Sequence, residues 1–244
     1  MSEKVNMKKW QEIWSKKKAD KSLLTSGDIE SVFMELKRVD GNDTLADGMG
    51  YEAFKKQYEF MLRNFKGDRD EIKSVFEAGC GSGPFLFLLE KDGYRVGGMD
   101  YSQPHIEAAS EVLDNPDELY CDEAICIKTD IKYDCVFTNS MFEYFSDYEY
   151  AYEVLKKMYE KSSYCVTVLD VHDLSKENAY LENRRSIIPD YDIKYEGLQK
   201  LFYDKQFFVG FAVEHGMDIK ITSSKLDGYW NKQFVFDVYM YKNL

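Results

Sequence analysis

The chain has 244 residues, of which 44% are hydrophobic and 16% aromatic, a length and composition that suit one α/β domain with additions. Its 32 basic and 44 acidic residues give a net charge of −12, which argues against DNA, RNA or an anionic membrane as the main partner, because such binding depends on Lys and Arg. The composition therefore favours a small molecule or a protein as the partner.

The five cysteines contain no C-x-x-C pair, so neither a disulfide framework nor a metal site is predicted. The N-terminus has no apolar run of signal-peptide length, and no stretch of the sequence is long and apolar enough to span a bilayer. We therefore expect a soluble, cytoplasmic protein, either a monomer or a homodimer.

Helical spacing of apolar residues predicts an N-terminal helical cap over residues 1–70. Three helices are expected in this cap, at 8–18, 28–37 and 51–65. A polar loop is expected at 40–49, between the second and third of them. Trp10 and Trp14 lie four residues apart, on one face of the first helix. They either pack the cap on the sheet or belong to a lid over a ligand site.

Residues 75–102 carry the clearest pattern in the chain. An apolar strand runs into Glu77 and a glycine-rich turn, a helix begins near Pro84, and a second strand ends at Asp100. Glycines at 79, 81 and 83 allow a tight turn and a close approach of the backbone to a ligand. Because a carboxylate at the end of the second strand suits a ribose diol, the segment predicts a nucleoside-binding βαβ unit.

The glycine spacing indicates which nucleoside ligand fits. Dinucleotide sites use G-x-G-x-x-G and place a pyrophosphate at the helix N-terminus, whereas this chain has G-x-G-x-G with Glu77 two residues before the first glycine. A carboxylate there would repel a pyrophosphate and suits a ligand that carries an ammonium and a sulfonium.

Alternating strands and helices continue after Asp100 and predict a parallel sheet covered on both faces. The expected strands are 124–128, 133–139 and 164–170, and the expected helices are 103–113 and 147–161. An insertion at about 174–200 then precedes a last helix at 206–215 and two final strands at 219–223 and 234–241. With the strand at 74–77, these elements define a second region, 71–244, whose carboxyl edge should hold the chemistry.

Two motifs in this region resemble those of the class I S-adenosylmethionine-dependent methyltransferases. Their first motif, E/D-x-G-x-G-x-G, is matched by Glu77 to Gly83, and their second, an acid followed by an aromatic residue and Ser, is matched by Asp100 to Ser102. The resemblance covers roughly residues 73–173. It implies S-adenosylmethionine as cofactor, S-adenosylhomocysteine as product, and a Rossmann-like fold with a mixed seven-stranded sheet that ends in an antiparallel hairpin.

The resemblance also implies a set of cofactor-binding residues. Asp100 would bind both ribose hydroxyls, Tyr101 would pack beside the adenine, and Asp130 would lie near the adenine amino group. Asn139 would present its backbone to the amino group of the cofactor. The full set is Glu77, Gly79, Gly81, Gly83, Asp100, Tyr101, Ser102, Asp130, Asn139 and Ser140.

Three residues are candidates for catalysis. Relatives often carry a His where Tyr144 stands, so Tyr144 either faces the acceptor or covers the cofactor. His172 follows the fifth expected strand, and its neutral imidazole is a candidate base for a hydroxyl acceptor. Asp173 follows it and, like Asp170 on its other side, would orient the imidazole or bind the acceptor.

The insertion holds the candidate substrate-binding residues Arg184, Arg185 and Tyr191. Because arginine forks match carboxylate or phosphate oxygens, they predict an anionic small-molecule acceptor. The chain looks similar to bacterial methyltransferases of capsule and other surface-polysaccharide biosynthesis, which suggests an oxygen of a sugar, nucleotide sugar or phosphoramidate-type precursor. An N-methyltransferase acting on a small amine and a non-catalytic S-adenosylmethionine-binding protein are the alternatives.

Overall fold

The computed structural model describes residues 7–42, 49–69 and 71–243, and most of the loop expected at 40–49 lies outside these ranges. Seven strands form one sheet in the order β3-β2-β1-β4-β5-β7-β6, in which β7 is antiparallel to both of its neighbours. The mixed seven-stranded sheet and its final antiparallel hairpin are thus confirmed. The strands are β1 (Ser74–Ala78), β2 (Arg95–Asp100), β3 (Glu118–Cys121), β4 (Tyr133–Asn139), β5 (Ser162–His172), β6 (Met217–Ser223) and β7 (Val235–Lys242).

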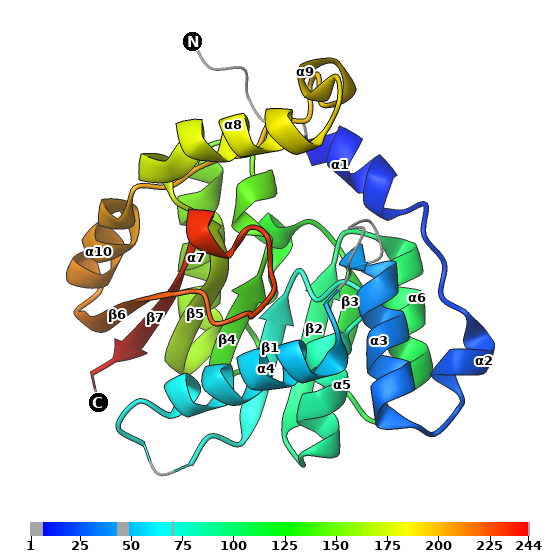
Figure 1. Ribbon diagram of the computed structural model, residues 1–244. Helices are drawn as coiled ribbons and strands as arrows, with labels where there is room; N and C mark the ends of the chain where they lie inside the picture. Colours follow the sequence, from blue (N-terminus) through cyan, green and yellow to red (C-terminus); the bar gives the residue numbers. More distant parts are fainter. Residues whose placement is uncertain (1–6, 43–48, 70, 244) are drawn as a thin grey trace.

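Helices cover both faces of the sheet (Figure 1). Helices α3 to α6 share one apolar core with one face of the sheet, and α7 and α10 share a second core with the other face. Alternation along the strands separates the cores, since Val75 faces the first and Phe76 the second. The helices are α1 (Met7–Trp14), α2 (Lys21–Leu24), α3 (Ile29–Val39), α4 (Tyr51–Lys66), α5 (Pro84–Lys91), α6 (Gln103–Val112), α7 (Tyr148–Lys161), α8 (Glu177–Ile187), α9 (Tyr191–Lys194) and α10 (Lys205–Glu214).

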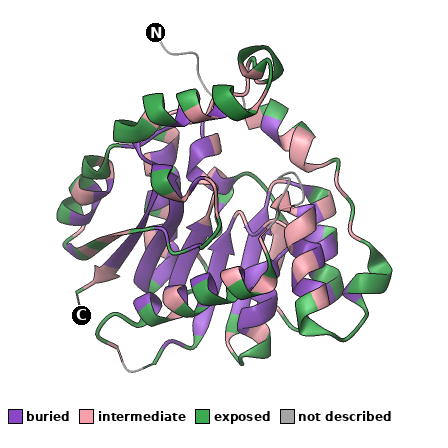
Figure 2. Ribbon diagram, viewed as in Figure 1, coloured by how far each residue is buried: buried purple, intermediate pink, exposed green. Residues whose placement is uncertain are grey.

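The five parallel strands end at one edge of the sheet, and the strand order reverses between β1 and β4. Ligands of open α/β sheets bind in the crevice at such a reversal, outside the carboxyl ends of the strands. Helices α1, α8 and α9 lie across this edge, at the top of Figure 1. Figure 2 shows the strands buried beneath them and the outer helix faces exposed.

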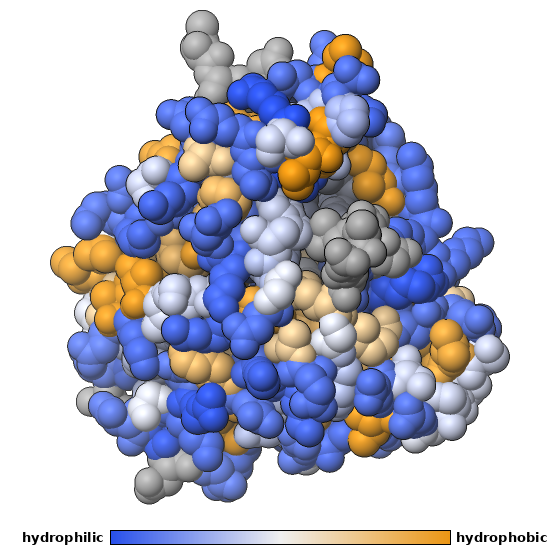
Figure 3. Space-filling model, in the orientation of Figure 1, coloured by the Kyte–Doolittle hydropathy of each residue, from blue (hydrophilic) through white to orange (hydrophobic). Residues whose placement is uncertain are grey.

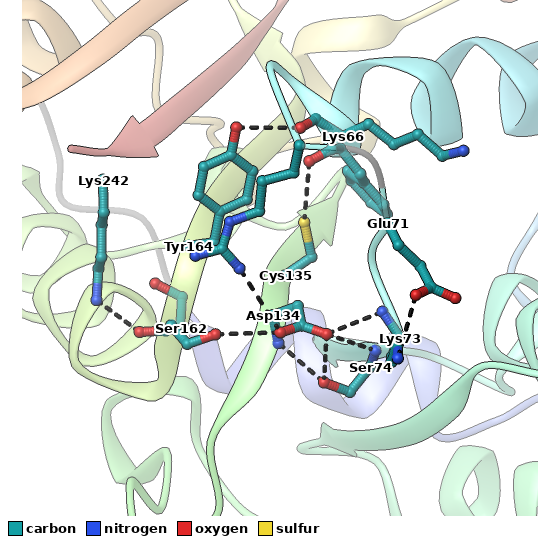
Figure 4. Close-up of polar contacts among 12 residues, drawn as sticks. Lys66, Glu71, Lys73, Ser74, Asp134, Cys135, Ser162, Tyr164 and Lys242 are labelled. Atoms are coloured by element: carbon teal, nitrogen blue, oxygen red, sulfur yellow. Dashed lines mark hydrogen bonds and ion pairs between the residues drawn. The ribbon is translucent and has the colours of Figure 1, made fainter. Parts of the chain in front are cut away.

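Hydrogen bonds join neighbouring segments at the opposite edge of the sheet (Figure 4). The Asp134 carboxylate, at the start of β4, accepts from the backbone N–H groups of Lys73 at 2.8 Å and Ser74 at 3.0 Å. Burial alone would raise the pKa of Asp134, but these donors lower it below its usual value. The Tyr164 hydroxyl donates to the Lys66 carbonyl at 3.0 Å and ties the end of α4 to β5. These contacts join the amino ends of β1, β4 and β5 to the end of α4.

The third strand differs from its expected position. Residues 124–128 were expected to form it, but β3 is Glu118–Cys121, and Ala124–Cys126 forms a 3₁₀ helix. The hydrogen-bonding edge of β2 is already filled, because Gly97 to Asp100 pair with β3. Ala124 and Ile127 instead pack into the core beneath α7, so their apolar character reflects burial in a helical turn.

Helices α8 and α9 occupy the segment after β5 in which the insertion is expected. The N-terminal helices α3 and α4 share their core with the sheet, and the division at residue 70 stays a prediction. None of the helices within the described residues is long and apolar enough to cross a membrane. Hydrophilic residues cover most of the face shown in Figure 3.

Candidate active site

A cavity of about 350 Å³ lies at the carboxyl edge of the sheet. Its lining combines the turn after β1, the ends of β2 and β4, and a late residue of β5. Helices α1, α3 and α8 and the loop before β7 also contribute to the lining. Segments far apart in the sequence therefore meet around one space, which is large enough for a small ligand.

The glycine turn forms one wall of this cavity. Gly79, Gly81 and Gly83 have φ values of 69°, 54° and 80°, all in the left-handed region that favours glycine. A Cβ at Gly79 would lie 2.5 Å from the Met141 sulfur, and a Cβ at Gly81 would lie 2.6 Å from an Asp40 oxygen. Gly79 and Gly81 line the cavity, whereas Gly83 lies outside the lining.

Glu77 places a carboxylate beside this turn. Its side chain is 3% exposed, and its Oε2 atom has no hydrogen-bond partner among the described residues. Burial raises the pKa of Glu77 well above its usual value, an effect that the nearby Lys37 ammonium opposes. A buried carboxylate oxygen without a partner is suited to a cationic or hydrogen-donating ligand.

Asp100 ends β2 with its carboxylate held in a fixed orientation. Its Oδ2 accepts from the Gly81 N–H at 3.0 Å, and its Oδ1 accepts from the Ser102 N–H at 2.8 Å. Burial raises the pKa of Asp100, and the nearby His105 opposes this shift. Tyr101 lines the cavity beside Asp100, whereas Ser102 is fully buried at the start of α6 and lies outside the lining.

The ends of β4 and β5 bring Asn139, Ser140 and Asp170 to the cavity. Ser140 and Asp170 have positive φ values of 54° and 60°, and the Ser140 hydroxyl donates to Asp170 Oδ2 at 2.5 Å. The Tyr229 hydroxyl donates to the same oxygen at 2.9 Å, while Asp170 Oδ1 is buried without a partner in the described chain. A register shift of β5 between Val168 and Val171 aims Asp170 at the cavity, as β-bulges do near active sites.

Glu143, Tyr144 and Lys200 form a second polar group in the lining. The Lys200 ammonium lies 3.5 Å from Glu143 Oε1 and 5.0 Å from the centre of the Tyr144 ring. Burial raises the pKa of Glu143 to about 7, and Lys200 opposes this shift. Trp10 packs edge-on against Tyr144 at 4.8 Å, and both residues line the cavity; the lid over a ligand stays a prediction.

The structure separates the two predicted arginines of the insertion. Arg184 lines the cavity and is 8% exposed, with its guanidinium 4.5 Å from the centre of the Trp230 ring. It donates to the Tyr195 hydroxyl at 3.2 Å, and its buried Nε has no partner among the residues described. Arg185 points away from the cavity and forms a 3.0 Å ion pair with Asp192, so its predicted role is corrected. Tyr191 lines the cavity, and its role in substrate binding stays a prediction.

The prediction of His172 as the base is also corrected, because its fully buried ring lies outside the cavity lining. Its centroid is 5.0 Å from those of Tyr180 and Phe202, and its Nε2 lies 3.1 Å from the Asn231 amide nitrogen. Burial lowers the pKa of His172 well below its usual value, an effect to which Lys200 adds. His172 is therefore a neutral packing residue.

Two predicted aspartates have other positions. Asp173 caps a 3₁₀ helix through the Ser175 N–H at 2.9 Å and pairs with Lys205 at 2.6 Å, outside the cavity lining. Asp130 is exposed and also lies outside the lining. Its predicted role followed from the misplaced third strand. Asp122 directly follows the true β3 and lines the cavity in its place.

Comparison with known proteins agrees with this architecture. Residues 76–161 match the family described as a methyltransferase domain. No curated protein sequence matches the chain significantly.

Solved structures of methyltransferases share the fold. The magnesium protoporphyrin IX methyltransferase from Synechocystis PCC 6803, with bound SAH, is 14% identical with a TM-score of 0.55 over 97% of this chain and 93% of that chain. A plantazolicin methyltransferase, in complex with a pentazolic analogue and SAH, is 14% identical with a TM-score of 0.60 over 98% of both chains. A methyltransferase from Clostridium acetobutylicum is 13% identical, with a TM-score of 0.57 over 78% of this chain and 91% of that chain. The Rossmann-like fold is confirmed by these structures, and the prediction of a methyltransferase by the domain match.

Proposed function

We propose that this protein transfers a methyl group from S-adenosylmethionine to an oxygen atom of a small anionic acceptor and releases S-adenosylhomocysteine. The observation that carries the proposal is one cavity that joins the glycine turn, Glu77 and Asp100 to an aromatic pocket around Arg184. Structural neighbours crystallised with the cofactor or its product support this choice of ligand. When bound, the cofactor supplies a methyl group on a sulfonium, which is already a good leaving group.

The residues at the glycine turn fit such a cofactor. In this proposal, Asp100 binds the ribose hydroxyls with an orientation that two backbone N–H groups maintain. The unpartnered oxygen of Glu77 favours a ligand with positive charge, and Tyr101 borders the adenine. Asn139 presents its backbone to the amino group of the cofactor. Asp122, in place of Asp130, lies near the adenine amino group.

The acceptor we propose is a sugar, nucleotide sugar or phosphoramidate-type precursor of a surface glycan. Arg184 supports an anionic group in it, because this arginine is buried without a carboxylate partner in the described part of the chain. A guanidinium group can donate two parallel hydrogen bonds to the oxygens of a phosphate or carboxylate. Trp230 and Tyr191 border the guanidinium and offer flat surfaces for a ring.

Asp170 is the group we propose for the proton of the acceptor hydroxyl. Its Oδ2 is held by Ser140 and Tyr229, which leaves the unpartnered Oδ1 to accept the proton. Burial raises the pKa of Asp170, which brings a carboxylate closer to the range useful for general base catalysis. Trp10 and Tyr144 cover the cavity and exclude water from the reacting groups.

The proposal is tested by measuring S-adenosylhomocysteine release over a panel of nucleotide sugars and sugar phosphates. With the acceptor that supports turnover, Arg184→Ala should raise KM by about tenfold or more, because it removes a charge-assisted hydrogen bond. Arg185→Ala is the matched control and should leave KM unchanged, since Arg185 pairs with Asp192 outside the cavity. Equal effects of both variants, or turnover only with uncharged acceptors, would contradict the anionic acceptor.

A small amine is the second candidate acceptor. The buried carboxylates of Asp170 and Glu143 both line the cavity and would attract an ammonium group. Turnover of amines in the same panel, without turnover of hydroxyl acceptors, would favour this N-methyltransferase. Tight binding of S-adenosylmethionine without turnover of any acceptor would favour a non-catalytic binding protein.

A further inference from the structure

Helix α3 of the N-terminal cap ends against the glycine turn. The Asp40 carboxylate accepts from both the backbone N–H and the hydroxyl of Ser82, each at 2.9 Å. The same hydroxyl, which is fully buried, lies 2.8 Å from the Leu36 carbonyl, which is an alternative acceptor for its one hydrogen. The N–H and the hydroxyl of Ser82 therefore hold the end of α3 on the turn with two hydrogen bonds. Helix α3 lies outside the segment that matches the methyltransferase family.

Asp40 and Lys37 present opposite charges to the cavity. They lie three residues apart, so they are neighbours on one face of α3, and both line the cavity. The Lys37 ammonium lies over the rings of Phe54 at 4.8 Å and Phe85 at 5.3 Å. Within the described ranges it lies near Glu77 but forms no ion pair or hydrogen bond with a carboxylate. Glu77, whose Oε2 is buried and unpartnered, lines the same region of the cavity.

We infer that Lys37 and Asp40 recognise the charged amino-acid end of the cofactor, Lys37 through its carboxylate and Asp40, with Glu77, through its ammonium. The pairing matches the chemistry of that end, because an α-amino acid carries one positive and one negative group close together. Charge-assisted hydrogen bonds of this kind are about twice as strong as neutral ones. This inference rests on the proposed function and adds the part of the cofactor site that the N-terminal cap supplies.

Asp40 also determines which ligands are excluded. It occupies the Ser82 N–H at the amino end of α5, the position that receives a pyrophosphate in dinucleotide-binding βαβ units. A phosphate there would lose this donor and lie beside the carboxylates of Asp40, Glu77 and Asp100. The cap therefore selects a zwitterionic adenosine ligand over a nucleotide.

Calorimetric titration with two probes tests this inference. The first probe is S-adenosylhomocysteine, and the second is 5′-methylthioadenosine, which has the adenosine and the sulfur but no amino-acid end. The Asp40→Asn variant retains an oxygen that accepts from Ser82, and Lys37→Met retains the aliphatic stem. Each variant should weaken S-adenosylhomocysteine binding by about tenfold or more and change 5′-methylthioadenosine binding by less than about twofold.

Glu30→Gln is the matched control, because it removes a charge from an exposed position in the first turn of the same helix. It should leave both affinities unchanged. Equal losses for both probes in Asp40→Asn and Lys37→Met, or no loss for either probe, would overturn the inference. If the unaltered protein does not bind S-adenosylhomocysteine, the proposed function itself fails, so the two failures are distinguishable. Should Asp40→Asn not fold, Lys37→Met alone decides the outcome.

Discussion

Replacement of Asp100 by Asn tests ribose recognition with little change in shape. The carboxylate accepts two backbone hydrogen bonds, from Gly81 and Ser102, one at each oxygen. An amide has one oxygen, so its NH₂ group must face one of these N–H donors. The substitution therefore both disturbs the turn and replaces a charged acceptor for the ribose with a neutral group.

The magnitude follows from these contacts. A hydrogen bond to a charged group contributes about 1.5–3 kcal/mol and a neutral one about 1 kcal/mol, so two ribose contacts together lose about 1–4 kcal/mol. We therefore expect S-adenosylhomocysteine affinity to fall by about fivefold to several hundredfold. The free energy of unfolding should change less, because burial penalises the charge that the substitution removes.

Calorimetric titration with S-adenosylhomocysteine measures this loss, and a thermal melt of each variant confirms folding. Asp130→Asn is the matched control, since the same change at an exposed aspartate outside the cavity should leave affinity unaltered. An Asp100→Asn variant that binds as tightly as the unaltered protein would refute the assignment, as would an equal loss in Asp130→Asn.

Three further predictions concern residues around the site. His172→Ala should lower the free energy of unfolding by about 3 kcal/mol, because it opens a cavity beside Tyr180. The variant should bind S-adenosylhomocysteine with unchanged affinity. A normal melting temperature with lost turnover would restore His172 as a catalytic residue. Gly81→Ala should abolish tight binding of S-adenosylhomocysteine, because the added Cβ clashes with Asp40. Gly93→Ala, also at positive φ but in open space, should cost only about 1–2 kcal/mol of stability. Similar binding by both variants would contradict a close approach of the Gly81 backbone to the ligand. Burial raises the pKa of Asp237 to about 7 from 3.8, so stability from this group is lost as pH rises between those values. Urea unfolding measures the free energy of unfolding at about pH 5 and about pH 8. This free energy should fall less between the two pH values in Asp237→Asn than in the unaltered protein, and equal falls would contradict the raised pKa of Asp237.

Local sequence patterns predicted the elements that form the glycine-turn side of the cavity. Glu77, the glycines and Asp100 belong to one βαβ unit, so their spacing alone brings them together at the end of β1 and β2. The third strand was misplaced because an apolar segment such as Ala124–Cys126 suits a buried helical turn as well as a strand. Asp130 was assigned a role for that reason alone.

The acceptor side of the site depends on contacts that sequence spacing does not reveal. Arg184 and Arg185 are adjacent in sequence, and only the direction of α8 shows which of them enters the cavity. Asp170 reaches the cavity because of a bulge and a positive φ, for which a non-glycine residue carries no sequence signal. Lys200 follows the insertion and meets the site only through the tertiary fold.

A crystal structure of the protein grown with S-adenosylhomocysteine would test the central claim most directly. We predict that the ribose lies against Asp100 and the amino-acid end lies beside the glycine turn, with the sulfur directed toward the pocket of Arg184. An adenosine bound elsewhere, or a pyrophosphate-bearing ligand in its place at the turn, would contradict the proposed cofactor and the roles assigned to these residues.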